Sequence, residues 1–134
     1  MSDANEVRPD RSYTRDHEWA KSEGQEIVVG ITAFAVSQLG EITLVNYDVK
    51  EGEAVASGQV FGTIESVKTL SDLFAPIAGT IRRVNKALET APESVNEDCW
   101  DKGWMVAITP APDASLDELL DVEAYRAHIA TLEA

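Results

Sequence analysis

The sequence predicts a mainly β protein, a small β-sandwich or barrel with helical additions. Many short apolar segments are separated by glycine-containing turns, which is typical of such folds. A chain of 134 residues, with 44% hydrophobic and 26% charged residues, can form one domain with a real core. Residues 1–11 lack apolar periodicity, so we expect a flexible N-terminus followed by a single domain over residues 12–134.

The first part of that domain should alternate short strands with one helix. Residues 13–20 and 26–31 are expected to pair as a hairpin, because a glycine-containing turn separates them. A threonine cap and a terminal glycine predict a helix over 32–39, and further strands should follow at 42–47 and 54–56. Strict alternation along 42–47 would put one set on one face and its complement on the other: Ile42, Leu44 and Asn46 against Thr43, Val45 and Tyr47.

The longest β-rich stretch runs from Val60 to Ile81 and is folded about Lys68. Apolar residues precede and follow this lysine, namely Phe61, Ile64, Val67, Leu70, Leu73, Phe74 and Ile77. Small polar residues lie close to it, which predicts a hairpin with arms in the core and a tip in water. Lys68 would then be presented to solvent on a rigid support, as an attachment point for another group.

The C-terminal part combines two more strands with a helical tail. Residues 80–85 and 103–109 are expected strands, joined by a mixed polar segment that should hold a helical turn. The Ser-x-x-Glu pattern at 115–118 is a capping box. It predicts a C-terminal helical segment over about 115–132, whose second piece begins near residue 122.

The charge balance limits the kinds of partner. Twenty-four acidic and eleven basic residues give a formal net charge of −13, which would repel phosphate backbones and anionic lipid surfaces. We therefore expect neither nucleic acid nor membrane as a partner, and brief docking on positively charged proteins instead. One cysteine and no recognisable targeting segment favour a cytoplasmic protein.

Motifs of independent catalysis are missing from the sequence. His17 and Glu18 are followed by Lys21 where a zinc protease would need a second histidine, and there is no glycine-rich phosphate loop or Gly-x-Ser-x-Gly turn. Cys99 has Asp101 nearby, which does not favour a thiolate. We therefore expect a protein that is not an enzyme. Lys68 alone is weak evidence for any function, because a lysine in a turn is most often only a solvated residue.

Residues 65–79 resemble the lipoylation segment of the glycine cleavage system H-protein family, which includes related lipoyl carriers. Further blocks resemble that family in the same order, at 13–19, 29–32, 38–41, 84–85, 95–98, 103–105 and 119–125. The resemblance implies the barrel-sandwich hybrid of lipoyl and biotinyl domains, with short helices and a C-terminal helix. It also implies lipoate in amide linkage on Lys68. Biotin is the lesser alternative, because Val67 and Thr69 replace the methionines that flank a biotinyl lysine.

The same resemblance implies roles for four more residues. Glu65 and Gly79 match positions that the lipoylating enzyme is expected to recognise. Glu18 and Asp72 match acidic positions beside a cleft in which the loaded arm rests. No metal site and no catalytic residue is expected.

The family's function also implies a set of partners. The arm would take an aminomethyl intermediate from a pyridoxal-phosphate glycine decarboxylase and pass its carbon to a folate-dependent aminomethyltransferase. Dihydrolipoyl dehydrogenase would reoxidise it, and a lipoate ligase or an octanoyltransferase would take part in attaching the lipoyl group. Tethering a reactive group raises its effective concentration at whichever partner is docked.

One segment departs from the family and leaves the partners open. Residues 43–52 lack the usual Leu-Pro and have one apparent extra residue. H-protein-like carriers also serve bacterial sulfur oxidation beside heterodisulfide-reductase-like complexes, which is the main alternative. A lipoyl-relay or scaffold protein is a further one.

Overall fold

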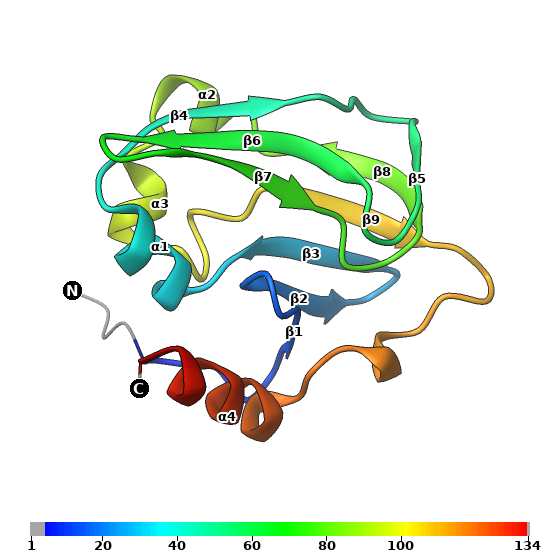
Figure 1. Cartoon of the computed structure of the whole chain (residues 1–134). Helices are drawn as coiled ribbons and strands as arrows, with labels where there is room; N and C mark the ends of the chain where they lie inside the picture. The colour runs from blue at the N-terminus through cyan, green and yellow to red at the C-terminus, as the bar shows by residue number, and fades with distance from the viewer. Residues whose placement is uncertain (1–4, 134) are drawn as a thin grey trace.

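Two β-sheets form the domain in the computed structural model, which describes residues 5–133 (Figure 1). The strands in this range are β1 Ser12–Tyr13, β2 Glu18–Glu23, β3 Glu26–Ile31, β4 Ile42–Tyr47, β5 Ala54–Val55, β6 Val60–Ser66, β7 Leu70–Phe74, β8 Gly79–Val84 and β9 Val106–Pro110. The helices are α1 Ala33–Leu39, α2 Ala87–Thr90, α3 Ser94–Glu97, the single 3-10 turn η1 Leu116–Glu118 and α4 Val122–Glu133. The predicted mainly β fold with a C-terminal helix is confirmed.

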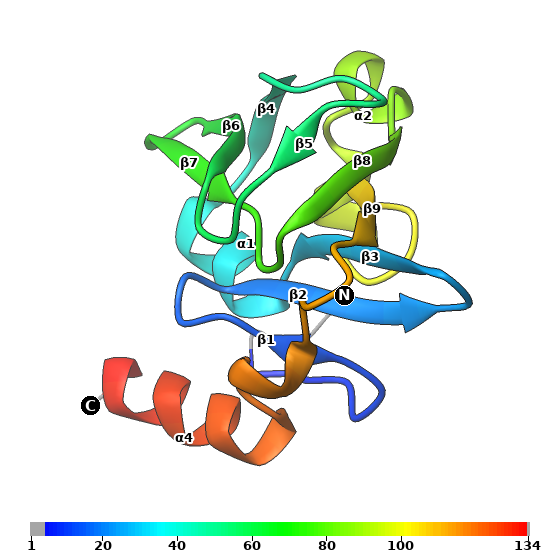
Figure 2. The same cartoon turned by 90° about the vertical axis from the view of Figure 1, so that its right-hand side faces the viewer.

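The strands divide into a larger and a smaller antiparallel sheet. One sheet has the order β1-β2-β3-β9-β8-β5, and the other has the order β4-β6-β7. Figures 1 and 2 show the smaller sheet above β2 and β3, with β8 and β5 of the larger sheet beside it, α1 near the free end of the β6–β7 hairpin and α4 beneath β1. Both predicted hairpins form, as β2–β3 and β6–β7, but with other bounds. The first arm is Glu18–Glu23 and not 13–20, and the second hairpin ends at Phe74, because residues from Gly79 onward belong to β8 of the larger sheet.

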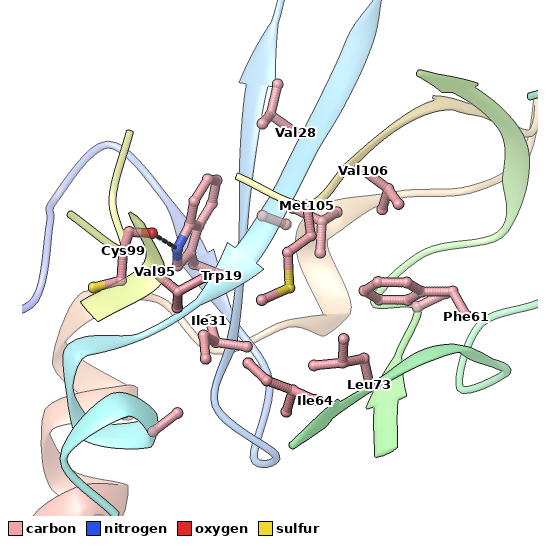
Figure 3. Packing of buried hydrophobic residues seen from close by; sticks show 14 of the residues in the cluster. Trp19, Val28, Ile31, Phe61, Ile64, Leu73, Val95, Cys99, Met105 and Val106 are labelled. Atoms are coloured by element: carbon pink, nitrogen blue, oxygen red, sulfur yellow. Dashed lines mark hydrogen bonds between the residues drawn. The ribbon is translucent and has the colours of Figure 1, made fainter. Parts of the chain in front are cut away.

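The core lies between the sheets and is built on large side chains from both. Phe61 and Leu73 of the smaller sheet are fully buried opposite Trp19 and Met105 (Figure 3). The Trp19 indole N–H donates to the Cys99 carbonyl at 3.0 Å, which satisfies its one polar atom. This packing fixes the distance between the sheets and therefore the position of the hairpin.

The segment before β1 is part of the packing from Val7 onward. Val7 is buried, and the Arg11 guanidinium lies 4.4 Å from the centroid of the Trp19 ring while donating to the Trp100 carbonyl at 2.6 Å. Of the segment predicted to be flexible, residues 1–4 lie outside the described residues. The domain boundary at residue 12 stays a prediction, but residues of 5–11 already contact the core.

The predicted helix after β3 is confirmed in its bounds and in both caps. Thr32 Oγ1 accepts a hydrogen bond from the Ala35 N–H at 3.2 Å, as an N-terminal cap does. The helix ends at Gly40, whose φ of 80° is a conformation that favours glycine. The chain therefore turns sharply from α1 into β4, close to the tip of the β6–β7 hairpin.

Strict alternation along β4 is a wrong prediction, because the strand contains a β-bulge. Ile42 pairs with Ser66 and Leu44 pairs with Glu65, so Thr43 is an extra residue on β4. Ile42 and Val45 consequently both face the core, whereas Leu44 is 44% exposed. A bulge shifts every following side chain to the other face.

The predicted start of the C-terminal helical segment is also wrong in part. Ser115 caps only the one-turn η1, and Leu119 is already extended, with ψ of 163°. Leu120 then exchanges two backbone hydrogen bonds of 2.8 Å with Tyr13 of β1. This strand-like pairing replaces the helix that the capping box favours, and α4 begins at Val122, as predicted.

Candidate functional site

Lys68 lies at the exposed tip of the β6–β7 hairpin, as predicted. The tip is a closed turn, in which the Ser66 N–H donates to the Thr69 carbonyl at 2.8 Å. Ser66 Oγ accepts from the N–H groups of Lys68 and Thr69 at 3.1 and 3.2 Å. A Cβ built on Gly40 would lie 3.4 Å from Lys68 Cε. The aliphatic part of the Lys68 side chain therefore lies close to Gly40, where the chain turns from α1 into β4. The turn that carries the lysine is thus closed by hydrogen bonds of Ser66, Lys68 and Thr69.

A second set of bonds ties the tip to the rest of the domain. The Val67 N–H donates to the Glu41 carbonyl at 3.0 Å. Asn96 of α3 holds the same loop, because its Nδ2 donates to the Gly40 carbonyl and its Oδ1 accepts from the Ile42 N–H, both at 2.9 Å. The lysine thus projects from a rigid support, and among residues 5–133 its amine makes no ion pair or hydrogen bond.

The hairpin arms are apolar, but not over their whole predicted length. Four of the predicted core residues are buried, namely Phe61, Ile64, Leu73 and Ile77. Val67 and Leu70, however, are 65% and 63% exposed beside the lysine, which corrects their assignment to the core. The tip therefore carries apolar side chains in contact with water.

A small pocket opens near the tip, between β2, α1 and β7, and it brings Glu18 and Asp72 together. Its volume is about 140 Å³, and both carboxyl residues contribute to its lining. The two residues differ in environment, because Glu18 is 2% exposed whereas Asp72 is exposed on strand β7. The pocket reaches Leu39, the neighbour of the glycine that lies close to the Lys68 side chain.

Glu18 is held as a neutral acid at the floor of this pocket. Burial raises the pKa of its carboxyl to about 8, because the charged form loses hydration. Hydrogen bonds from Thr14 Oγ1 at 2.6 Å and from the Phe74 N–H at 3.4 Å act in the opposite direction and offset only part of that effect. Glu18 is thus mostly protonated at neutral pH, whereas Asp72 is open to solvent.

His17, which the sequence reasoning did not select, also lines the pocket. Its Nδ1 lies 2.8 Å from the Tyr125 hydroxyl, which lies 2.8 Å from Thr32 Oγ1. Burial, with a contribution from His128, lowers the pKa of His17 and favours the neutral ring. His17 and Tyr125 are 108 residues apart, so no local pattern could have revealed this contact.

Glu65 lies in the smaller sheet, and Gly79 lies in the larger one. Glu65 is exposed on β6, three residues before Lys68, while Gly79 starts β8 and pairs with Val55 and Pro110. A Cβ on Gly79 would collide with the Thr109 carbonyl oxygen and would lie 2.7 Å from Ile108 Cγ2. The structure thus gives Gly79 a packing role, and its role in recognition stays a prediction.

Gly79→Ala should lower the free energy of unfolding by about 2 kcal/mol, because rigid backbone atoms would have to move. Urea unfolding measures this change, and Thr80→Ala, at the exposed neighbouring position, should change stability by less than about 0.5 kcal/mol. An equally stable Gly79→Ala protein that is lipoylated slowly would contradict the packing role and favour recognition.

Cys99 is a structural residue. It is buried, and burial, reinforced by Asp98, raises the pKa of its thiol to about 12, so the reactive thiolate is disfavoured. In residues 5–133 no group of three or more His, Cys, Asp or Glu side chains is arranged to hold a metal ion. No helix in the described part of the chain is long and apolar enough to cross a membrane.

Two packed sheets hold a hydrogen-bonded turn, and this turn presents a lysine whose amine has no ion pair or hydrogen bond in the described chain. This is the arrangement of a carrier domain. The family model described as glycine cleavage H-protein matches residues 11–132. The chain therefore belongs to the glycine cleavage H-protein family, a family of lipoate carriers with non-catalytic roles.

Individual relatives agree with this assignment. A glycine cleavage system H protein of Bacteroides fragilis is 51% identical over 86% of this chain and 90% of that protein. One from Anaeromyxobacter sp. (strain K) is 47% identical over 92% of this chain and 96% of that protein. The crystal structure of a glycine cleavage system H protein from Mycobacterium marinum is 36% identical, with a TM-score of 0.84 over 92% of this chain and 99% of that one. The predicted fold class is thereby confirmed.

Proposed function

We propose that Lys68 carries lipoate in amide linkage and that the resulting arm shuttles an aminomethyl intermediate between the glycine cleavage enzymes. The observation that carries this proposal is the turn Ser66–Thr69, which fixes the lysine backbone while its amine makes no ion pair or hydrogen bond in the described chain. An amine held in this way is open to acylation, and the bound group can move freely about a fixed origin.

Attachment is an acyl transfer to the lysine. The Lys68 amine attacks the carboxyl carbon of an acyl adenylate made from lipoate and ATP. An amide bond forms, the bond to AMP breaks, and the nitrogen loses two protons on passing from ammonium to amide. When bound, lipoate supplies a dithiolane that exchanges between disulfide and dithiol forms.

The pocket beside the tip would shelter the end of the arm. Asp72 at its rim offers a solvated carboxylate to a cationic amine, and Glu18 offers a buried carboxyl. A cation that enters the pocket would favour ionisation of Glu18, because an opposite charge nearby lowers the pKa of a carboxyl. These two residues would therefore hold the cargo, while the sheets keep it away from bulk water.

The proposed partners are a pyridoxal-phosphate glycine decarboxylase, a folate-dependent aminomethyltransferase, dihydrolipoyl dehydrogenase and a lipoate ligase or octanoyltransferase. The net charge of −13 supports brief docking on positively charged surfaces of such proteins. The family match and the relatives described above favour glycine cleavage over the sulfur carrier and the relay or scaffold. The cytoplasm is the proposed location, supported by a single unpaired, buried cysteine.

The test is the exchange of bicarbonate carbon with the glycine carboxyl, catalysed by glycine decarboxylase with this chain as carrier. The lipoylated chain should support exchange in proportion to its concentration, and the unmodified chain should support at least tenfold less. An established H protein loaded in the same way is the positive control. If the fully lipoylated chain gave no exchange while that control was active, the proposed role in glycine cleavage would be wrong.

A further inference from the structure

His17 lines the pocket beside the hairpin tip, and its ring contacts both α1 and α4. Nδ1 of the ring lies 2.8 Å from the Tyr125 hydroxyl of α4. The ring centroid lies 4.8 Å from that of Phe34 in α1 and 5.7 Å from that of His128 in α4. The other ring nitrogen, Nε2, makes no hydrogen bond with residues 5–133 and is not fully buried. Nε2 is therefore the polar atom of this side chain that a ligand in the pocket can reach.

The backbone of His17 adopts a conformation that is uncommon for a residue with a side chain. Its φ is 73°, and no other non-glycine residue among residues 5–133 has a positive φ. Two backbone hydrogen bonds hold it there, because the His17 N–H donates to the Thr14 carbonyl at 3.2 Å and the His17 carbonyl accepts from the Thr32 N–H at 3.0 Å. Backbone strain of this kind clusters at functional sites, where the surrounding structure holds a side chain in place.

The charge of His17 suits a cationic neighbour. Burial lowers the pKa of its ring and His128 adds to this effect, which favours the neutral ring at pH 7. A neutral imidazole can accept a hydrogen bond from an amine, whereas an imidazolium would repel it. An ammonium group brings three N–H donors, and Glu18 is a poor acceptor as long as it is protonated. The titratable groups around the ring are Asp16, Glu18 and Asp72 in the pocket and Tyr125 and His128 on α4.

We propose that His17 is a third binding residue for the cationic end of the loaded arm, whose amine donates a hydrogen bond to Nε2. Tyr125 is the positioning residue, because its hydroxyl holds Nδ1 from α4 without lining the pocket itself. The inference rests on the proposed function and adds this pair to the pocket of Glu18 and Asp72. It also gives the C-terminal helix a role, since α4 fixes a side chain that meets the cargo.

The hydrogen bond at Nδ1 decides what Nε2 can do. A neutral imidazole carries one N–H, so Nε2 is an acceptor only when the proton is on Nδ1. Tyr125 permits this tautomer, because its hydroxyl can accept from Nδ1 and donate to Thr32 Oγ1, 2.8 Å away. The reverse order of donors, from Thr32 to Tyr125 to Nδ1, leaves the proton on Nε2. An amine that enters the pocket should therefore select the first arrangement.

The first measurement is the protonation state of His17 in the lipoylated chain and in the chain loaded by glycine decarboxylase with glycine. Loading moves the aminomethyl group of glycine to one sulfur of the disulfide and leaves the other as a thiol, while the carboxyl leaves as carbon dioxide. Nitrogen NMR of the two histidines should place the His17 proton on Nδ1 after loading. The pKa of His17 should fall by about 1 unit, because a cation at Nε2 opposes protonation. His128, which does not line the pocket, should shift less.

The second measurement is the lifetime of the loaded arm in the absence of the transferase. Water attacks the methylene carbon of an arm that has left the pocket, and the products are formaldehyde, ammonia and the free thiol. His17→Asn removes Nε2, whereas the asparagine amide can still bond to Tyr125 and tolerates a positive φ. Formaldehyde release should become about fivefold faster, as expected for the loss of one hydrogen bond that holds the arm in the pocket.

Tyr125→Phe tests the positioning residue, because it removes the hydroxyl and keeps the ring that stacks on Tyr13 with centroids 4.5 Å apart. Release should become about threefold faster, and part of the His17 proton should return to Nε2 in the loaded chain. A purely structural role of Tyr125 would leave the tautomer unchanged. His128→Asn is the matched control on α4, outside the pocket, and its lifetime should stay within about twofold of the parent. Urea unfolding should show each variant folded under the assay conditions.

Three outcomes would overturn the inference. A His17 proton on Nε2 in the loaded chain, with a parental lifetime in His17→Asn, would remove His17 from the site and leave the proposed function intact. An equal acceleration in His128→Asn would assign the effect to the packing of α4 and not to the pocket. If the lipoylated chain could not be loaded while an established H protein could, the proposed function would fail together with this inference.

Discussion

Replacing Lys68 with arginine should abolish lipoylation completely while the fold is retained. A guanidinium stays protonated at any physiological pH and offers no amine for acylation. The turn itself should persist, because its hydrogen bonds come from the backbone and from Ser66 Oγ, and the lysine side chain is exposed. Nucleophilicity is thus the property that this substitution removes.

Intact mass and peptide mapping after incubation with ligase, lipoate and ATP measure this loss. Lys50→Arg is the matched control, because Lys50 is also exposed and adjoins the turn that follows β4. The Lys50→Arg chain should gain one lipoyl group on the Lys68 peptide. A lipoyl group found on the Lys68→Arg chain would move the attachment site to one of the four other lysines.

The position of Lys68 could be predicted because the signal is local. Apolar periodicity on both sides of the lysine and short polar residues around it specify a hairpin without knowledge of the rest of the fold. The α1 helix was predicted for the same reason, since Thr32 and Gly40 cap it within its own sequence. Local rules succeed where the bonds that define an element are made inside it.

The errors arise where a distant strand decides the local conformation. The bulge at Thr43 depends on how β4 is paired with β6. An alternating pattern of apolar and polar residues cannot predict it, because a bulge adds one residue to the alternation. The helix expected after Ser115 gives way to backbone pairing of Leu120 with Tyr13, more than a hundred residues away. In both places tertiary pairing outweighs a local preference.

The pocket could be predicted only from the resemblance to the H-protein family. Glu18 and Asp72 are 54 positions apart, by subtraction of their residue numbers, and no spacing rule joins them. The protonation of Glu18 was not predicted, because it follows from burial beneath α1 and β7. A sequence-based view of two equivalent acids therefore becomes one buried neutral acid and one solvated carboxylate.

Glu18→Gln should stabilise the unloaded protein by about 3 kcal/mol at pH 7. In the unfolded chain Glu18 ionises near its ordinary pKa of 4.5, whereas in the folded protein its pKa is about 8. Folding at neutral pH must therefore suppress the ionisation of this carboxyl. Glutamine has nearly the same shape and carries no ionisation penalty. Its carbonyl oxygen can accept from Thr14 Oγ1, and only the long 3.4 Å hydrogen bond from the Phe74 N–H is lost.

The sign of the effect defines a pH window. A carboxyl with a raised pKa contributes its full stability below about pH 4.5, and this contribution falls as pH rises towards 8. The difference between Glu18→Gln and the parent should therefore be near zero at pH 4, grow through neutral pH and become constant above pH 8. Urea unfolding at a series of pH values measures this difference and cancels the titration of all other groups.

Asp72→Asn provides the control on the same pocket. Asp72 is exposed, so removing its charge should change stability by less than about 0.5 kcal/mol at every pH in the series. A parent and a Glu18→Gln protein with parallel stability profiles from pH 4 to 9 would show that Glu18 ionises normally in the folded state. If instead the profiles diverge as expected, a cationic cargo that enters the pocket should favour ionisation of Glu18. Loading of the arm should then release more protons from the parent than from Glu18→Gln, and the carbon dioxide formed contributes equally to both.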